Sequence, residues 1–198
     1  MHDEIPFRIA LAVILIFTAS VALHYRLKSA ASGERISHRD EGYVFAAVLR
    51  LAGLCLWGST LAYLIAPTWI QWASFPLPDW VRWCGAVTGL ISSWLMHWTL
   101  SSLGTNLTDT VVVRKEATLV TQGPYRWVRH PYYVTAALIM GSATLLSANH
   151  LIGVSGVLVL GLLAVRTPKE EQRLIERFGD DYRHYMSRTG RFLPKIGR

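Results

Sequence analysis

A chain of 198 residues is long enough for one domain, but with 52% hydrophobic and only 17% charged residues it is too apolar for an average soluble one. The formal net charge is +7, and the positive residues lie between and after long apolar runs. This pattern is typical of membrane topology and attraction to anionic lipid. We therefore expect a single membrane domain over residues 1–198, with membrane lipids as neighbours and no nucleic-acid partner.

Five apolar runs predict five membrane-spanning helices, because about 20 apolar residues are needed to cross the hydrocarbon core. The runs cover residues 6–25, 43–66, 79–101, 132–147 and 150–166. The first follows Asp3 and Glu4 rather than a basic stretch, so we interpret it as a retained helix and not a signal peptide. The expected fold is an all-α integral membrane protein, with residues 1–101 holding the first three spans and residues 102–198 the rest.

The last two runs are short and only a few residues separate them, which predicts a tight helical hairpin that turns at Ala148 and Asn149.

Cys55 and Cys84 lie inside apolar runs, and we interpret both as small core residues. No spacing of His, Cys, Asp or Glu indicates a metal site or a disulfide framework. We therefore expect no metal.

The connecting segments alternate in charge, which predicts the orientation in the membrane. Lys and Arg gather in residues 25–42, in residues 102–131 and after residue 166, whereas residues 67–78 contain neither. The positive-inside rule then places the N-terminus outside and the C-terminus in the cytosol. An aromatic belt is expected at the outer interface from Trp69, Trp72, Trp80 and Trp83.

Two segments do not fit lipid, and both fall on the cytosolic side. In the first, residues 102–131, alternation over residues 110–114 and 117–121 predicts extended chain before a turn at residues 123–124. The second begins with Thr167-Pro168 and acidic residues, which indicates either a new helix start or a kink in a helix that continues from the fifth span. We expect the amphipathic helix that follows to end at Gly179.

The stretch Arg129-His130-Pro131 stands directly before the fourth span. Pro131 suits the first position of a helix, so His130 is expected beside a helix N-terminus, where free backbone N–H groups favour an anion. The same aromatic and basic composition also fits an interfacial anchor without a ligand. From the residues alone, both readings stay open.

A second group of charges lies at the end of the fifth span. On a continuous helix Arg166 and Glu170 share a face, and Glu171 follows. An arginine at this position can bind a carboxylate through two hydrogen bonds, and a glutamate can accept bonds from a ribose or an ammonium group. A structural ion pair with a snorkelling arginine explains the spacing equally well.

Taken together, the two groups resemble the isoprenylcysteine carboxyl methyltransferase family and the related membrane phospholipid methyltransferases. The resemblance covers residues 102–195 and is carried by Arg129-His130-Pro131-x-Tyr133, an apolar hairpin, and Glu170-Glu171. The motifs Phe178-Gly179-x-x-Tyr182-x-x-Tyr185 and Thr189-Gly190-Arg191-Phe192-x-Pro194 follow in order. The first two spans carry no matching motif.

The resemblance implies an S-adenosylmethionine-dependent methyltransferase with a cytosolic cofactor pocket formed by residues 102–131 and the C-terminal helical tail. It assigns Glu170 to catalysis as well as to the cofactor, and Arg166 to catalysis and to the methyl acceptor; Arg129 is expected to help bind the acceptor. The residues expected to contact the cofactor are Thr118, Leu119, Val120, Tyr125, His130, Pro131, Tyr132, Tyr133, Glu170 and Glu171. Many relatives have a histidine where this chain has Ala117, so a side-chain contact there is lost.

The expected acceptor is lipophilic, most simply the carboxylate of a prenylated cysteine or a similar acid. A phospholipid amine or a small thiol is the alternative, and such an acceptor would need a base near Arg166. A non-enzymatic membrane protein or a nicotinamide-dependent reductase relative is a further alternative. The sequence does not give the oligomeric state.

Overall fold

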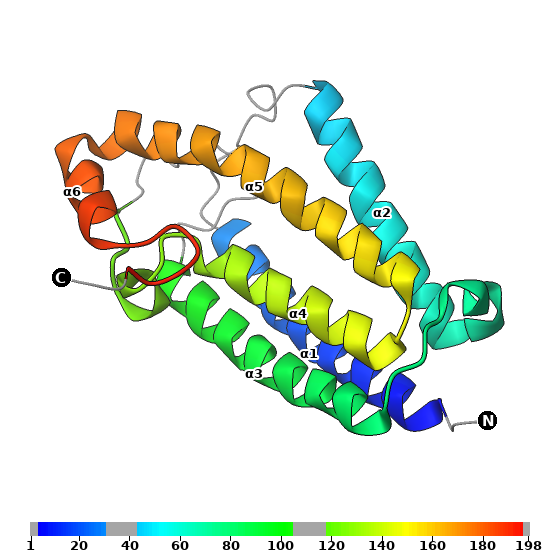
Figure 1. Ribbon diagram of the computed structural model, residues 1–198. Helices are drawn as coiled ribbons and strands as arrows, with labels where there is room; N and C mark the ends of the chain where they lie inside the picture. Colours follow the sequence, from blue (N-terminus) through cyan, green and yellow to red (C-terminus); the bar gives the residue numbers. More distant parts are fainter. Residues whose placement is uncertain (1–3, 31–42, 105–117, 196–198) are drawn as a thin grey trace.

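The computed structural model describes residues 4–30, 43–104 and 118–195, and all the regular elements of this part of the chain are helices (Figure 1). Its α-helices are α1 (Ile5–Ala30), α2 (Tyr43–Ile65), α3 (Asp79–Leu103), α4 (Pro131–Ser147), α5 (His150–Phe178) and α6 (Asp180–Arg188). Short 3-10 helices occupy Pro67–Trp69 (η2), Gln71–Ala73 (η3) and Gly123–Arg126 (η5). The extended segments expected before residue 117, and Ala117 itself, lie outside the described residues.

All five expected spans are helices, and three of them are long and apolar enough to cross a membrane. These three are α1, α2 and α5. α4 has 17 residues, which is about 25 Å of helix at a rise of about 1.5 Å per residue. The structure therefore confirms an all-helical protein with three candidate spans among the described residues.

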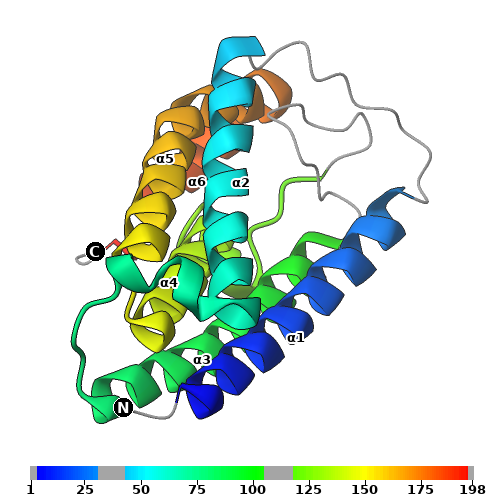
Figure 2. The same cartoon turned by 90° about the vertical axis from the view of Figure 1, so that its right-hand side faces the viewer.

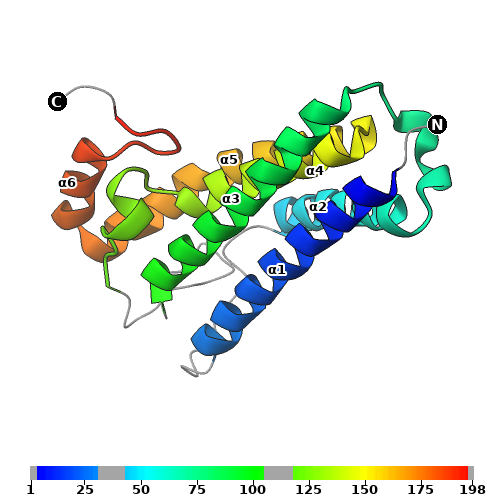
Figure 3. The same cartoon turned by 90° about the horizontal axis from the view of Figure 1, so that it is seen from below.

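α3 lies along both α1 and α4, and α2 lies along α5 (Figures 2 and 3). Glycine makes the contact between α3 and α4 close: a Cβ atom at Gly85 would lie 2.8 Å from the Cβ atom of Leu145, and one at Gly89 would lie 2.5 Å from Ser142 Oγ. The Ser142 hydroxyl donates a 2.7 Å hydrogen bond to the Gly85 carbonyl. Small residues and interhelical hydrogen bonds are the usual means of packing helices in lipid, where burial of apolar surface gives little gain.

The end of the bundle opposite α6 is held by a buried arginine. Arg82 of α3 donates to both carboxylate oxygens of Glu4, at 2.8 and 2.6 Å, and to the Leu146 carbonyl at the end of α4. The Tyr63 hydroxyl of α2 donates to the same Glu4 carboxylate at 2.9 Å. These contacts join the first four helices, and Phe7 of α1 lies under the Arg82 guanidinium. The first helix is thus an integral part of the bundle.

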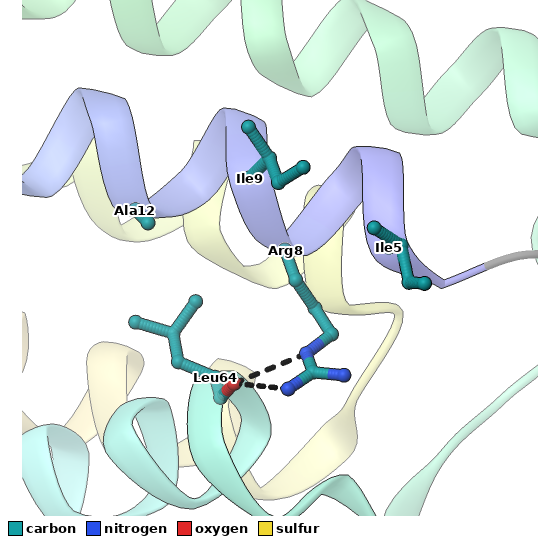
Figure 4. A pocket seen from close by; sticks show the side chains of 5 residues that line it. All are labelled: Ile5, Arg8, Ile9, Ala12 and Leu64. Carbon is teal, nitrogen blue, oxygen red and sulfur yellow. Dashed lines mark hydrogen bonds between the residues drawn. The ribbon is translucent and has the colours of Figure 1, made fainter.

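A shallow groove of about 290 Å³ lies nearby, between α1 and the end of α2 (Figure 4). Its lining is apolar except for Arg8, which donates through Nε and Nη2 to the Leu64 carbonyl. Carbonyls in the last turn of a helix have no partner within the helix, and a basic side chain satisfies them well. Arg8 therefore acts as a cap that fixes the end of α2 against α1.

The α4–α5 hairpin forms as predicted. Ala148 adopts a left-handed conformation with φ +45°, and Asn149 caps α5 by accepting hydrogen bonds from the backbone N–H groups of Leu151 and Ile152. The side chain of Asn149 also donates to the Ile70 carbonyl at 2.9 Å. One short turn thus reverses the chain and ties it to the η2–η3 connection.

The interpretation of Thr167-Pro168 as a helix start is wrong, and the alternative of a continuing helix is confirmed. α5 runs through Pro168 to Phe178 without a break. Pro168 has no N–H for the Ala164 carbonyl, so the helix lacks one backbone hydrogen bond there, and Thr167 Oγ1 adds a side-chain bond of 2.9 Å to the neighbouring Leu163 carbonyl. Gly179, with φ +58°, ends the helix as expected.

The interpretation of Cys55 and Cys84 as core residues is wrong, because both are exposed on the helix bundle. An apolar run does not show which of its faces contacts protein and which contacts lipid, and that is why the prediction failed.

The four tryptophans expected at one interface are all exposed, between 46% and 77%. They lie on the η2–η3 connection and at the start of α3.

Candidate active site

Three segments that are distant in the sequence meet at the α6 end of the bundle (Figure 1). They are the turn before α4, the last three turns of α5, and the C-terminal segment, by which we mean residues 189–193. The first two are the segments whose charges the sequence singled out. Ion pairs, hydrogen bonds and ring contacts join the three segments.

Glu171 is the most heavily contacted side chain of the site. Its Oε1 accepts a 2.8 Å hydrogen bond from Arg129 Nε and lies 3.4 Å from His130 Nε2. Its Oε2 accepts from Arg191 Nε at 3.1 Å and from Arg191 Nη2 at 2.5 Å. The Glu171 side chain is 4% exposed. Both carboxylate oxygens are therefore occupied by protein donors, and we call these four residues the Glu171 cluster.

Glu170 has a different environment from its neighbour. Its Oε1 accepts a 2.6 Å hydrogen bond from the Tyr133 hydroxyl and lies 2.8 Å from Arg166 Nε. Its Oε2 lies 3.7 Å from His130 Nδ1, beyond hydrogen-bond distance. The side chain is 15% exposed, compared with 4% for Glu171. Glu170 thus keeps one oxygen with spare acceptor capacity.

The His130 ring lies between the two carboxylates and is enclosed by aromatic rings. It stacks on Tyr133 with centroids 5.6 Å apart and planes at 6°, and the Phe192 ring lies 5.9 Å away. α4 begins at Pro131, so His130 is the residue before its first turn, as predicted. His130 and Tyr133 are three residues apart and face α5 together, because such residues share one side of a helix.

The C-terminal segment pairs with the turn before α4. The backbone N–H of Arg129 donates to the Gly190 carbonyl at 2.8 Å, and that of His130 donates to the Arg191 carbonyl at 3.1 Å. Arg129 Nη1 donates to the carbonyls of Thr189 and Met186. The backbone of residues 189–191 therefore fixes both the main chain and the side chain of Arg129.

The two tyrosines of α6, Tyr182 and Tyr185, are buried beside this region. Tyr185 donates a 2.6 Å hydrogen bond to the Tyr125 carbonyl, so α6 holds η5 in place. Burial raises the pKa of Tyr125, Tyr182 and Tyr185, so all three hydroxyls stay protonated at neutral pH. Tyr182 is 1% exposed, and within the described residues its hydroxyl has no hydrogen-bond partner. A buried hydroxyl of this kind is expected to bind a water or a ligand atom.

The structure brings six of the expected site residues into contact, namely Arg129, His130, Tyr133, Arg166, Glu170 and Glu171, and places the others differently. Tyr132 turns to the other side of α4 and packs against the core residues Tyr25, Met96 and Leu100. Thr118, Leu119 and Val120 form irregular chain that leads into η5. Pro131 is buried as the first residue of α4. Arg129 directs its donors at protein groups and not at open space.

Sequence reasoning missed the contribution of the C-terminal segment. Arg191 and Phe192 belong to a motif that the sequence displayed, but no charge pattern or periodicity linked them to Glu171 or His130. The sequence signal that could have found it is the glycine directly before Arg191. In the structure a Cβ atom at Gly190 would lie 1.7 Å from the Leu193 carbonyl oxygen. A glycine of this kind marks a tight turn that brings a neighbouring side chain back towards the fold.

The donor set suits S-adenosylmethionine, the cofactor that the sequence resemblance implies. Glu170 offers a carboxylate with a spare oxygen, which suits an ammonium group or ribose hydroxyls, and His130, Tyr133 and Phe192 offer aromatic faces for an adenine or a cationic sulfur. The buried Tyr182 hydroxyl adds a donor without a partner in the described structure. Within the same residues, no group of three or more His, Cys, Asp or Glu side chains is placed to hold a metal ion.

Part of the chain is similar to a known protein family. Residues 86–176 match the model of the isoprenylcysteine carboxyl methyltransferase family. Protein-S-isoprenylcysteine O-methyltransferase of Homo sapiens is 32% identical over 130 residues, which are 64% of this chain and 46% of that protein. Methanethiol S-methyltransferase 1 of Bradyrhizobium diazoefficiens is 33% identical over 86 residues, which are 42% and 30% of the two chains.

The fold is also similar to a solved structure, that of a eukaryotic intramembrane Ras methyltransferase of the isoprenylcysteine carboxyl type. The two share a TM-score of 0.57 and 20% identity, over 94% of this chain and 68% of the other. At this identity the likeness concerns the fold. The chain spans about half the length of the curated isoprenylcysteine methyltransferases it matches.

Proposed function

We propose that this chain is an S-adenosylmethionine-dependent methyltransferase of the isoprenylcysteine carboxyl methyltransferase family, with a lipophilic acceptor, because it is similar to that family over residues 86–176. The favoured acceptor is the carboxylate of a prenylated cysteine or a similar lipophilic acid. The observation that carries the proposal is the joining of Arg166, Glu170 and the His130–Tyr133 face of α4 in one cluster. This is the pair of motifs that the family shares.

We propose that all five long helices cross the membrane, with the N-terminus outside and the site at the cytosolic face. The exposed tryptophans on the η2–η3 connection and at the start of α3 support an outer interface at that end. The site is formed at the opposite end, where basic residues gather. A lipid-borne acceptor can then reach the site while its lipid part stays in the bilayer.

The cofactor is proposed to lie against η5, the start of α4 and Glu170. Bound S-adenosylmethionine supplies a methyl group on a positively charged sulfur. Glu170 holds ribose hydroxyls or the ammonium group through its spare oxygen, and the Tyr133 hydroxyl keeps that carboxylate in one orientation. Thr118, Leu119, Val120 and Tyr125 are proposed to complete the pocket through the chain that leads into η5.

Arg166 is proposed to orient the acceptor. Its side chain is 10% exposed and lies beside Glu170, so it stands where the cofactor site meets the helix surface. A guanidinium pairs with a carboxylate without giving up a proton, which leaves the carboxylate charged and able to attack. Holding the two reactants in line is the main requirement for a transfer of this kind.

Three residues expected at the site are better assigned to structure. Arg129 and Glu171 were expected to bind acceptor and cofactor, but their polar atoms are directed at each other and at protein groups. We propose that both are positioning residues, which hold His130 and the start of α4 in place. Tyr132, which packs into the core, is likewise proposed to support α4 without touching the cofactor.

A thiol acceptor is the second candidate, and one observation favours it. A thiol must lose its proton before it attacks, and two candidate bases are present: Glu170 lies 2.8 Å from Arg166 Nε, and His130 Nδ1 lies 3.7 Å from the other Glu170 oxygen. Related proteins are named as methanethiol methyltransferases, in Bradyrhizobium diazoefficiens and in Mycobacterium tuberculosis. The structure therefore supports testing both acceptor classes.

Two measurements on the purified full chain test the proposal. Titration with S-adenosylhomocysteine should give saturable binding at one site, and labelled methyl should pass from S-adenosylmethionine to one acceptor class. The panel should include prenylated cysteines, phospholipids and thiols, with a soluble cysteine methyl ester as a blank. Failure to bind S-adenosylhomocysteine would refute the methyltransferase assignment, and transfer to thiols alone would replace the favoured acceptor.

A further inference from the structure

Three parts of the chain meet at the Glu171 carboxylate. Arg129 comes from the turn before α4, Glu171 from α5, and Arg191 from the C-terminal segment. Two guanidinium groups thus share one glutamate, and each takes a different oxygen. This division means that loss of one arginine leaves the other ion pair intact.

The two arginines differ in how they reach Glu171. The Arg129 side chain is 8% exposed and is enclosed by the fold, whereas the Arg191 side chain is 42% exposed and comes in from the surface. Charge-assisted hydrogen bonds of this length are among the stronger side-chain contacts in proteins. Arg191 is therefore a surface residue whose guanidinium group is bound to the buried Glu171 carboxylate.

The position of Arg191 also determines what surrounds His130. The Arg191 carbonyl accepts the hydrogen bond from the His130 N–H, and the next residue, Phe192, places its ring 5.9 Å from the imidazole. If the Arg191 side chain is released, the two backbone hydrogen bonds at Gly190 and Arg191 are left to hold the C-terminal segment. The aromatic surroundings of His130 then lose one side.

We propose that Arg191 is a positioning residue of the cofactor site. By pairing with Glu171 it holds the C-terminal segment against the turn before α4, and so keeps His130 and Phe192 in the arrangement that binds S-adenosylmethionine. Arg191 itself does not touch the cofactor or the acceptor. The proposal rests on the proposed function, because it concerns affinity for that cofactor.

The test uses Arg191→Ala and Arg191→Lys in the full chain, with Arg183→Ala as the matched control. Arg183 is also a tail arginine in an ion pair, but its side chain is 62% exposed and its partner Asp180 is 94% exposed. Arg191→Ala should weaken S-adenosylhomocysteine binding by roughly tenfold, as expected for loss of one charge-assisted contact. Arg191→Lys should recover part of the loss, and Arg183→Ala should bind as the wild type does.

Two further readouts separate positioning from general damage. In Arg191→Ala the amides of Arg129 and His130 should exchange hydrogen faster, since their acceptors lie on the C-terminal segment, while α1 and α3 exchange as in the wild type. In turnover, KM for S-adenosylmethionine should rise and kcat at saturation should stay within about twofold, as expected when ground-state and transition-state binding fall equally.

The outcomes distinguish this proposal from the proposed function. Wild-type protein that does not bind S-adenosylhomocysteine would refute the function itself. Wild-type binding together with equal affinity in Arg191→Ala would overturn the role of Arg191 alone. Unchanged amide exchange at Arg129 and His130 would likewise overturn it, because the C-terminal segment would then be held without Arg191.

Discussion

Arg129 and Glu171 form a buried ion pair, with 2.8 Å between Nε and Oε1, although 42 positions separate them in the sequence. The α4–α5 hairpin makes the contact possible, because it returns the chain to the end of the bundle at which α4 began. The pair joins two motifs that each have an ordinary structural explanation when taken alone. Their contact is what makes a shared site the better explanation.

Glu171→Gln should destabilise the fold. It leaves two guanidinium groups, one of them buried, without the carboxylate that neutralises them, and removing one partner of a buried pair costs about 3–5 kcal/mol. We expect the free energy of unfolding to fall by about 3 kcal/mol, measured by thermal or denaturant unfolding in detergent. Glu176→Gln is the matched control, since Glu176 lies on the same helix with its side chain 53% exposed. Equal stability of the two variants would contradict the importance of the Glu171 cluster.

Glu170→Gln should weaken cofactor binding more than it weakens the fold. Glutamine can still accept the hydrogen bond from Tyr133, but it lacks the negative charge that an ammonium group or a ribose would use. Affinity for S-adenosylhomocysteine should fall by about tenfold, as judged by calorimetric titration. The melting temperature should change less than in Glu171→Gln. Unchanged affinity would remove Glu170 from the pocket.

Arg166→Ala should abolish turnover and leave cofactor binding largely intact. The acceptor would lose the group that orients it, and misplacement of a reactant by about 1 Å costs about 100-fold in rate. Transfer of labelled methyl should therefore drop at least about 100-fold, while S-adenosylhomocysteine affinity changes by less than about threefold. Arg166→Lys keeps the charge without the planar fork and should recover only part of the activity. Normal turnover in Arg166→Ala would refute its acceptor role.

Arg82→Leu should affect stability alone. Arg82 lies at the start of α3 and bonds Glu4 and the end of α4, so it is at the opposite end of both helices from His130. Loss of its charged hydrogen bonds should lower the free energy of unfolding by about 2 kcal/mol. S-adenosylhomocysteine affinity, measured below the melting temperature, should stay within about twofold of wild type. The exposed Arg50 of α2 provides the control Arg50→Leu, and a large loss of affinity in Arg82→Leu would show that the two ends are coupled.

Hydropathy predicted the helices well because lipid requires every backbone group to be bonded within its own helix. Local sequence patterns predicted the structure less well where tertiary contacts determine the course of the chain. Pro168 carries a helix-start signal, yet α5 continues through it, since a helix packed against α2 and α4 tolerates one lost hydrogen bond. The link from Arg191 to Glu171 depends on a pairing between residues 128 and 190 that no local pattern encodes. The motifs therefore predicted which segments meet, and the structure added what holds them.

Gly190→Ala should reproduce the effect of Arg191→Ala by a different route. A Cβ atom at residue 190 would lie 1.7 Å from the Leu193 carbonyl oxygen, and this oxygen belongs to the backbone, so the turn itself must open. Opening it moves the Arg191 carbonyl away from the His130 N–H and lengthens the reach of the Arg191 side chain to Glu171. S-adenosylhomocysteine affinity should fall by at least the tenfold expected for Arg191→Ala, and the His130 amide should exchange faster.

The control for this change is Gly161→Ala on α5, where nothing lies within 4 Å of the added atom. There the substitution should leave cofactor affinity unchanged and keep or raise stability, since alanine favours a helix over glycine by about 1 kcal/mol. If Gly190→Ala also binds the cofactor as the wild type does, the C-terminal segment takes no part in the site. If it binds weakly while Arg191→Ala binds normally, the backbone of the segment, and not the Arg191 side chain, positions His130.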